Sequence, residues 1–210
     1  MDHRPKRVLA AMLAALSVLG YTGTVLAVPA FEAVPDPDYD STNDNWSLGF
    51  QFTTNQPIVV SALGFYDNGQ DGLVESHSVG IFDTSGSLLA SAIVEPSDPL
   101  DGLFRYHLID ALTLPAGQDF IAAAVTGTEE YFWGPLSIAW DPSITFVMDR
   151  YDLTTGDNLI FPTSASGAGL VRWFGPNFQI GAAEQVIPEP HCLAILALGG
   201  LGLWRRRRKR

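Results

Sequence analysis

The chain has 210 residues, which is enough for one folded domain with appendages. Hydrophobic residues make up 47% of it and aromatic residues 11%, which excludes wholesale disorder. Between residues 28 and 190 the sequence holds three Arg and no Lys against 22 Asp or Glu. So acidic a body repels phosphate, which excludes nucleic acid as its partner. The single cysteine, Cys192, excludes an internal disulfide and a multi-cysteine zinc site.

Residues 1–27 predict a secretory signal peptide. Three bases lie near the start: Arg4, Lys6 and Arg7. They are followed by a largely apolar run of 12 residues, Val8 to Leu19, and by the small-residue cleavage site Val25-Leu26-Ala27. The apolar run is shorter than the roughly 20 residues of a stable membrane span. We expect signal peptidase to cut after Ala27. A cut after Ala30 fits the same rule, and an uncleaved anchor or a buried N-terminal helix is a further alternative.

Alternation of apolar and polar residues begins at Trp46 and predicts an all-β body. Short runs of this kind, separated by Gly, Pro and Asp turns, predict about eight strands: 46–53, 58–66, 77–82, 88–94, 104–108, 120–125, 144–151 and 173–180. We expect a single antiparallel β-sandwich, jelly-roll-like, over residues 46–181, with one core between Trp46 and Ile180. The Pro- and Asp-rich stretch 28–45 predicts an exposed arm. A short linker, 182–186, follows the body.

The last 24 residues consist of three parts. Ile187-Pro188-Glu189-Pro190 comes first, and its prolines keep the chain extended and accessible. The 12 apolar residues Leu193 to Trp204 follow, and we expect them to form a short helix. With the two residues before it, that helix reaches about 21 Å, short of a ~30 Å hydrocarbon core. Six bases end the chain and would hold it on the cytoplasmic side: Arg205, Arg206, Arg207, Arg208, Lys209 and Arg210.

This tail resembles the PEP-CTERM sorting signal of Gram-negative bacteria, which has the same three parts in the same order. The resemblance implies processing by an exosortase, transient anchoring in the inner membrane, and delivery to the cell surface or the exopolysaccharide matrix. His191 and Cys192 are unusual after the motif and leave the processing site open. An ordinary tail anchor is the alternative interpretation.

The region from Phe50 to about Val125 resembles an uncharacterised β-sandwich domain that is common among PEP-CTERM proteins. Its matching segments are Gly49-Phe50-Gln51-Phe52, Ala62-Leu63-Gly64-Phe65-Tyr66-Asp67, Asp71-Gly72-Leu73, His77-Ser78-Val79-Gly80-Ile81-Phe82 and Ser87-Leu88-Leu89-Ala90, with Gly175-Pro176-Asn177-Phe178 near the end. This resemblance implies a fold and no particular reaction.

One acidic loop has the spacing of a calcium site. Asp67, Asp71 and Glu75 occupy relative positions 1, 5 and 9, with a glycine at position 6. Gly69 at position 3 has no side-chain ligand, and Ser78 stands at position 12, where a bidentate Glu is expected. The alternative is a turn between two strands in which glycines adopt positive φ. No other cofactor is expected.

Aromatic residues gather around Gly134-Pro135. Tyr131, Trp133 and Trp140 could stack on sugar rings beside acidic side chains, and packing in the core is the alternative.

The sequence has no Gly-x-Ser-x-Gly elbow and no His-Glu-x-x-His helix. The two histidines of the body, His77 and His107, fall within expected strands and are interpreted as ordinary side chains. We therefore expect a non-enzymatic structural or binding module at the cell surface or in exopolysaccharide, with polysaccharide as a candidate ligand. The alternative is an exported carbohydrate-active hydrolase, because any two of the 22 acids could form a catalytic pair.

Overall fold

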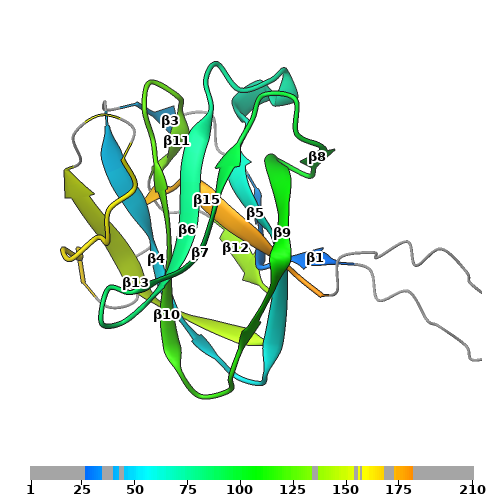
Figure 1. Ribbon diagram of the computed structural model, residues 1–210. Coiled ribbons are helices and arrows are strands. Elements are labelled where there is room, and N and C mark those ends of the chain that lie inside the picture. Colours follow the sequence, from blue (N-terminus) through cyan, green and yellow to red (C-terminus); the bar gives the residue numbers. More distant parts are fainter. Residues whose placement is uncertain are drawn as a thin grey trace, which may run out of the picture.

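The computed structural model describes residues 27–34, 40–42, 45–133, 137–153, 156, 158–167 and 173–181. This part of the chain is all-β, and its sheets are antiparallel (Figure 1). Its one helical element is a 3-10 turn, Asn68–Gln70, and no helix in it is long and apolar enough to cross a membrane. The expected linker, sorting tail and C-terminal helix lie outside the described residues, as does all of the signal peptide but Ala27.

The strands, in chain order, are β1 (Val28–Pro29), β2 (Phe31–Val34), β3 (Asp40–Ser41), β4 (Trp46–Thr54), β5 (Ile58–Tyr66), β6 (His77–Asp83), β7 (Leu88–Val94), β8 (Leu100–Asp101), β9 (Phe104–Leu114), β10 (Asp119–Val125), β11 (Tyr131–Trp133), β12 (Ser137–Trp140), β13 (Ile144–Leu153), β14 (Trp173–Phe174) and β15 (Pro176–Ile180). All eight expected strands are confirmed. The last of them is divided at Gly175, and its two pieces join different sheets.

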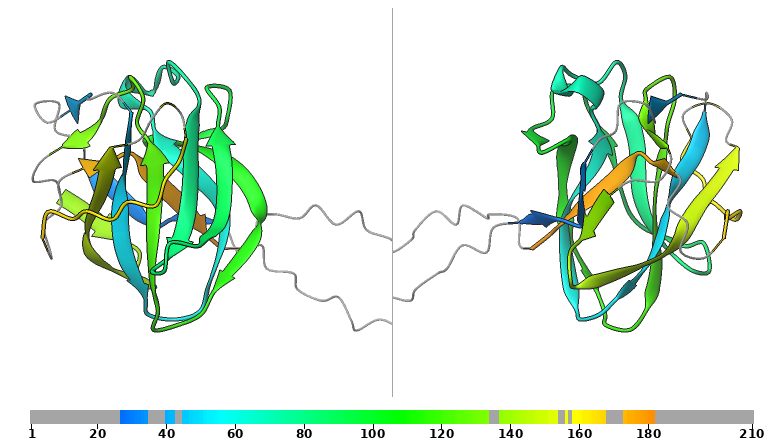
Figure 2. Two further views of the ribbon diagram at one scale, coloured as in Figure 1. Left: turned by 60° about the vertical axis from the view of Figure 1, so that its left-hand side comes forward. Right: turned by 180° about the vertical axis from the view of Figure 1, so that it is seen from behind.

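Two five-stranded sheets make up most of the body. The first has the order β1-β15-β5-β9-β8, and the second has the order β13-β4-β10-β6-β7. Short sheets β14-β11-β3 and β12-β2 complete the described part. Figures 1 and 2 show the two large sheets curling toward one another.

The hydrophobic core lies between the two large sheets. Phe50 and Phe52, two residues apart on β4, contribute from the second sheet, and Phe178 contributes from the first. The rings of Phe52 and Phe178 have centroids 5.0 Å apart. The alternation that predicts β4 therefore also identifies the face that meets the opposite sheet.

The expectation of an exposed arm over 28–45 is wrong at its beginning. Ala30 is fully buried and its N–H donates to the Phe178 carbonyl at 2.7 Å. Phe31 is 1% exposed, and its ring lies 5.4 Å from that of Phe104. The core therefore begins before Trp46. Apart from Pro29, the Pro and Asp residues of this stretch all follow Val34, so they carry little information on residues 28–34.

A segment without regular strands, 158–167, crosses the outer face of the second sheet (Figure 2, left). Leu159 and Phe161 pack there on Phe82, Ile121 and Ala123, which form a small separate hydrophobic cluster. The sequence does not predict this contact, because Leu159 and Phe161 belong to no alternating run.

Candidate functional site

The expected sorting residues lie outside the described part of the chain. These are Ile187, Pro188, Glu189 and Pro190, together with the terminal bases Arg205 to Arg210. The structure does place the two ends of the body. Val28 of β1 pairs with Ile180 of β15, so the chain enters and leaves the body on the same side (Figure 2).

Each outer carboxylate of the expected calcium site is held by protein donors. Asp67 is fully buried, and its Oδ2 accepts a hydrogen bond from Arg105 Nε at 2.7 Å. Glu75 accepts from the backbone N–H and the hydroxyl of Thr128. The Thr128 N–H lowers the pKa of Glu75; partial burial opposes this effect, and the Thr128 hydroxyl and His77 add to it.

The structure does not bring Asp67, Asp71 and Glu75 together. No group of three or more His, Cys, Asp or Glu side chains within the described ranges could hold a metal ion. Gly69 and Gly72 adopt φ of 75° and 113°, as the alternative interpretation of a turn requires. The loop is therefore a turn in which Asp67 and Glu75 bind protein groups and Asp71 is exposed.

Of the expected sugar-stacking residues, Tyr131 and Trp140 have described side chains, and neither is an exposed aromatic ring. Tyr131 is 2% exposed, so that its ring cannot reach a sugar, and the prediction is wrong at this residue. Trp140 is partly buried against the core, with its ring stacked on Phe146 at a centroid distance of 5.1 Å. The side chain of Trp133 is not among those that the structure describes.

The two histidines lie in strands, as expected, but in different surroundings. His77 in β6 is 1% exposed, and its Nδ1–H donates to the Val125 carbonyl at 2.9 Å. Its Nε2 has no hydrogen-bond partner and lies 3.7 Å from Glu129 Oε2. His107 in β9 is half-exposed, and its Nδ1 lies 3.0 Å from Asp98 Oδ2.

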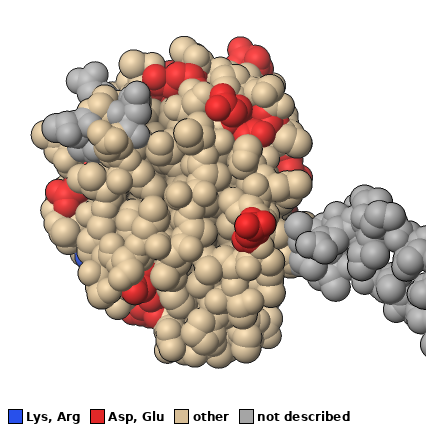
Figure 3. Space-filling model, in the orientation of Figure 1, with Lys and Arg blue, Asp and Glu red and all other residues tan. Residues whose placement is uncertain are grey.

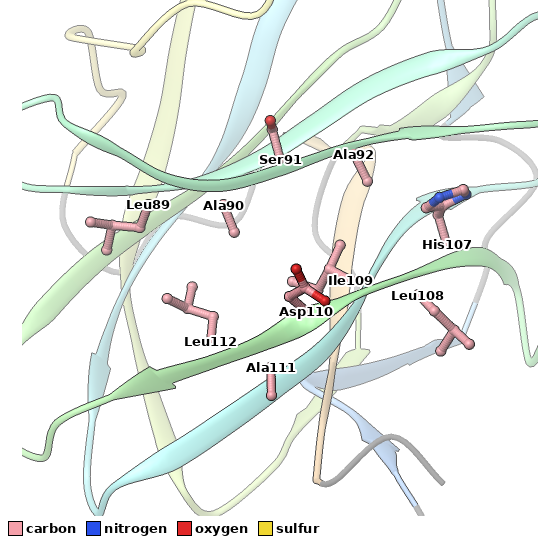
Figure 4. A pocket seen from close by; sticks show the side chains of 10 residues that line it. All are labelled: Leu89, Ala90, Ser91, Ala92, His107, Leu108, Ile109, Asp110, Ala111 and Leu112. Carbon is pink, nitrogen blue, oxygen red and sulfur yellow. The ribbon is translucent and has the colours of Figure 1, made fainter. Parts of the chain in front are cut away.

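An open groove of about 580 Å³ runs between the edge strand β7 of the second sheet and β9 of the first. We call it the edge groove. Figure 4 shows Ala90 and Ala92 of β7 pointing toward β9, where Ile109 and Leu112 face them, while Ser91 and Leu108 point away. The small alanine side chains leave the space open. Asp110 is its one carboxylate, so the edge groove holds no acid pair.

A second hollow of about 330 Å³ lies between the segment Pro29–Ala33 and the β8–β9 hairpin, Asp101–Tyr106. We call it the aromatic pocket. Its lining includes three aromatic residues of the core that are almost fully buried: Phe31, Phe104 and Tyr106. Two carboxylates, Glu32 and Asp101, line it as well, and both residues are exposed.

The Tyr106 hydroxyl is buried and has no hydrogen-bond partner, although the residue lines the aromatic pocket. Both polar atoms of the nearby Asn177 side chain are engaged, since its Nδ2 donates to the Phe31 carbonyl and its Oδ1 accepts from the Phe178 N–H. Burial raises the pKa of Tyr106 well above its usual range; the negative charge of Asp101 adds to this effect, the Asn177 side chain opposes it, and Glu32 adds to it. The pocket is therefore electronegative.

A third hollow, about 560 Å³, is lined by two acids, Asp83 and Asp119. Asp119 accepts from Thr53 and Gln51. Asp83 closes the β6–β7 turn, and hydrogen bonds from the Ser85 hydroxyl and the Ser87 N–H lower its pKa. A glycosidase needs a carboxyl group with a raised pKa as its general acid. The electrostatics of Asp83 are opposite to that requirement.

The aromatic pocket is a feature of the surface that sequence reasoning missed. Its members come from two segments some 70 residues apart, Pro29–Ala33 and Asp101–Tyr106. Phe104 and Tyr106 alternate as strand residues, but nothing in that pattern shows that Glu32 lies near them.

A protein-family model described as a domain of unknown function, DUF4082, matches residues 32–140, just over half of the chain. The match begins inside β2 and includes both walls of the edge groove and most of the aromatic pocket. No curated protein matches the chain.

Proposed function

The chain belongs to the DUF4082 family, a domain of unknown function, and on that premise we propose that it is an exported, exosortase-processed β-sandwich protein of the cell surface or exopolysaccharide. Its body is a non-enzymatic structural or binding module. Signal peptidase and exosortase act on its two ends, the membrane holds it transiently, and polysaccharide is its ligand.

The sandwich architecture is supported by the two large sheets and the single core cluster between them. The chain crosses repeatedly from one sheet to the other, from β4 to β5, from β5 to β6, from β7 to β9 and from β9 to β10. Such crossings are typical of jelly-roll topologies.

The observation that carries the proposal is the tripartite tail. Ile187-Pro188-Glu189-Pro190 is followed by an apolar stretch that is too short to span the hydrocarbon core of a membrane without mismatch, and then by six bases. A mismatched span suits a temporary signal better than a permanent anchor.

The test replaces Pro188, Glu189 and Pro190 together with Ala. Export should continue, because the N-terminal signal is unchanged, but uncut protein should accumulate in the inner membrane. The measurement is fractionation with mass spectrometry of the C-terminus in a strain with an active exosortase. The matched control replaces Glu184, Gln185 and Val186, the three residues before the motif that begins at Ile187, and should be released normally. Recovery of mature surface protein that still ends at Arg210 would show that the tail is a permanent anchor.

The hydrolase alternative requires a carboxyl group with a raised pKa beside a second carboxylate. Asp83 and Asp119 share a hollow, and the lowered pKa of Asp83 does not suit the general acid of such a pair. Glycan hydrolysis by the purified protein that disappears in Asp83→Asn or Asp119→Asn would favour the hydrolase.

A further inference from the structure

We propose that the edge groove binds a protein partner: an extended segment that adds to β7 as a further strand and carries large apolar side chains alternating with basic ones. This inference goes beyond the proposed function, because it concerns a protein rather than a polysaccharide and does not depend on the sorting tail. Three properties of the molecule carry it: the free edge of β7, the unfilled space beside that edge, and the charge of the surrounding surface.

β7 is an edge strand, and within the described ranges it pairs with β6 alone. Sheet edges present unpaired N–H and C=O groups, which natural proteins protect with charges, proline, bulges, short strands or a covering segment. The opposite edge strand, β13, is covered, since Tyr151 exchanges backbone hydrogen bonds with Ser164. β1 and β8 have only two residues each. β7 has seven residues, with no charge and no proline. A register shift near its beginning, opposite Ile81 and Phe82, leaves Ala90–Val94 regular.

The groove beside this edge has room for the side chains of an added strand. Every second side chain of a strand points to the same face, so that a strand added to β7 would direct alternate side chains past Ala90 and Ala92 toward β9. Figure 4 shows these two alanines facing Ile109 and Leu112 across the groove. All four residues are partly exposed, and Ala92, Ile109 and Leu112 pack against the hydrophobic core. The space of about 580 Å³ is therefore an open extension of the core, which large apolar side chains would fill.

The surface around the groove decides what kind of strand fits. Leu89, Ile93 and Leu108 form an apolar rim and are 39%, 54% and 68% exposed. Asp110 lines the groove, and Glu95 follows β7 directly. Figure 3 shows acidic side chains around this face of the molecule and hardly any basic ones. Lys and Arg at the solvent-facing positions of the partner strand would meet these carboxylates.

A second copy of this chain fits the groove less well. Its own β7 would bring Ala90 and Ala92 into the space that the same two alanines leave open, so that the groove would stay unfilled. The two bodies would also repel one another, because each holds 22 acids against three Arg between residues 28 and 190. Both observations favour a different chain, with larger apolar side chains and with bases.

The experiment measures the binding of a labelled, end-blocked peptide, Lys-Leu-Lys-Leu-Lys-Leu-Lys, to the protein purified after export, by fluorescence anisotropy. We expect saturable binding that weakens as salt is added, because salt screens the charges. A peptide of the same composition with its three leucines placed together should bind at least about tenfold more weakly, since it cannot direct every leucine into the groove. A peptide in which Glu replaces every Lys should not bind.

Matched variants of the protein locate the site. Ala92→Leu fills the groove and should weaken binding at least about tenfold. Ser91→Leu adds the same side chain at the next residue, which points away from the groove, and should leave binding unchanged. Thermal melting checks that both variants fold, and Ala90→Leu is a second variant that fills the groove.

N-methylation of the peptide tests whether it pairs as a strand. A strand added at one edge uses only every second N–H. Methyl groups on one alternate set of peptide nitrogens should therefore abolish binding, and methyl groups on the other set should not.

Two outcomes would overturn the proposal. Equal effects of Ala92→Leu and Ser91→Leu, or equal binding of the two lysine peptides, would show that only the general charge of the body attracts the peptide. A dimer of the protein alone that Ala92→Leu prevents, with no peptide binding, would show by sedimentation velocity that a second copy occupies the groove. None of these measurements involves the tail, so that their outcome is separate from that of the sorting test.

Discussion

His77 and Phe65 stack face to face across the core, with ring centroids 3.7 Å apart and planes inclined by 4°. Phe65 belongs to the first sheet and His77 to the second, so this pair joins the two layers. The Nδ1–H of His77 is directed to the Val125 carbonyl, which leaves Nε2 facing Glu129 without a hydrogen bond. A neutral imidazole fits this position as an aromatic ring that also satisfies one carbonyl.

We predict that the protein loses stability as the pH falls below the pKa of an unperturbed histidine. Burial lowers the pKa of His77 from 6.5, against the opposing effects of the Val125 carbonyl, Glu129 and Glu75. The unfolded chain therefore takes up this proton first, and the stability that is present above pH 6.5 is lost as the pH falls through the folded-state pKa. Thermal melts between about pH 5 and 7.5 measure this loss of stability.

The control is the other histidine of the body. His77→Phe keeps a stacking ring but cannot titrate, so its stability should be lower throughout and less dependent on pH in this window. His107→Gln changes a half-exposed side chain at the edge groove, and melting it beside His77→Phe shows which of the two histidines carries the slope. An unchanged slope in His77→Phe would refute the assignment to His77.

A second prediction concerns the first residues of the body. Phe31→Ala should lower the free energy of unfolding by about 3–5 kcal/mol, because it removes a buried ring that contacts Phe50, Phe104 and Trp140. Denaturant unfolding of residues 28–181 measures this loss. Leu108→Ala, at a residue that is 68% exposed, should stay within about 0.5 kcal/mol. Equal effects of the two substitutions would show that Phe31 lies in an exposed arm.

How much of the fold the sequence predicts depends on the kind of contact. Strands such as β5 and β7 have the expected bounds, because alternation is a local property of consecutive residues. β1, β2 and β12 are too short to alternate, and each forms only by pairing with a strand far away in the chain. Pairings of this kind, such as that of Phe31 with Trp140, follow from tertiary packing, and composition does not reveal them.

A third prediction separates the two carboxylates of the acidic loop. Asp67→Ala should destabilise the protein by about 3–5 kcal/mol with or without calcium, because Arg105 then loses its buried partner. Asp71→Ala, at an exposed residue, should change stability by less than about 0.5 kcal/mol. Thermal melts with and without millimolar calcium measure both. A calcium-dependent rise in melting temperature that disappears in Asp71→Ala would support the calcium site that the spacing predicts.

The same loop shows why the candidate sites were harder to predict than the strands. Spacing places Asp67, Asp71 and Glu75 in a ligand-like series, but their partners, Arg105 and Thr128, are distant in sequence. A carboxylate that binds a protein donor has the same sequence signature as one that binds calcium. The aromatic pocket has the opposite difficulty, because Glu32 and Asp101 are 69 residues apart and share no motif.

The last prediction concerns the N-terminus of the mature protein, where the small-residue rule allows a cut after Ala27 or after Ala30. We predict that the first residue is Val28. A cut after Ala30 removes β1 and the Ala30 N–H that bonds the Phe178 carbonyl, and it places a charged α-amino group on Phe31, which is 1% exposed. A charge buried there costs several kcal/mol, and each lost hydrogen bond costs about 1 kcal/mol. Val28 is 41% exposed, so that the new ammonium group after a cut at Ala27 remains in water. N-terminal sequencing of the exported protein decides between them, and a first residue of Phe31 contradicts the prediction. A body that begins at Phe31 should also melt at a clearly lower temperature than one that begins at Val28.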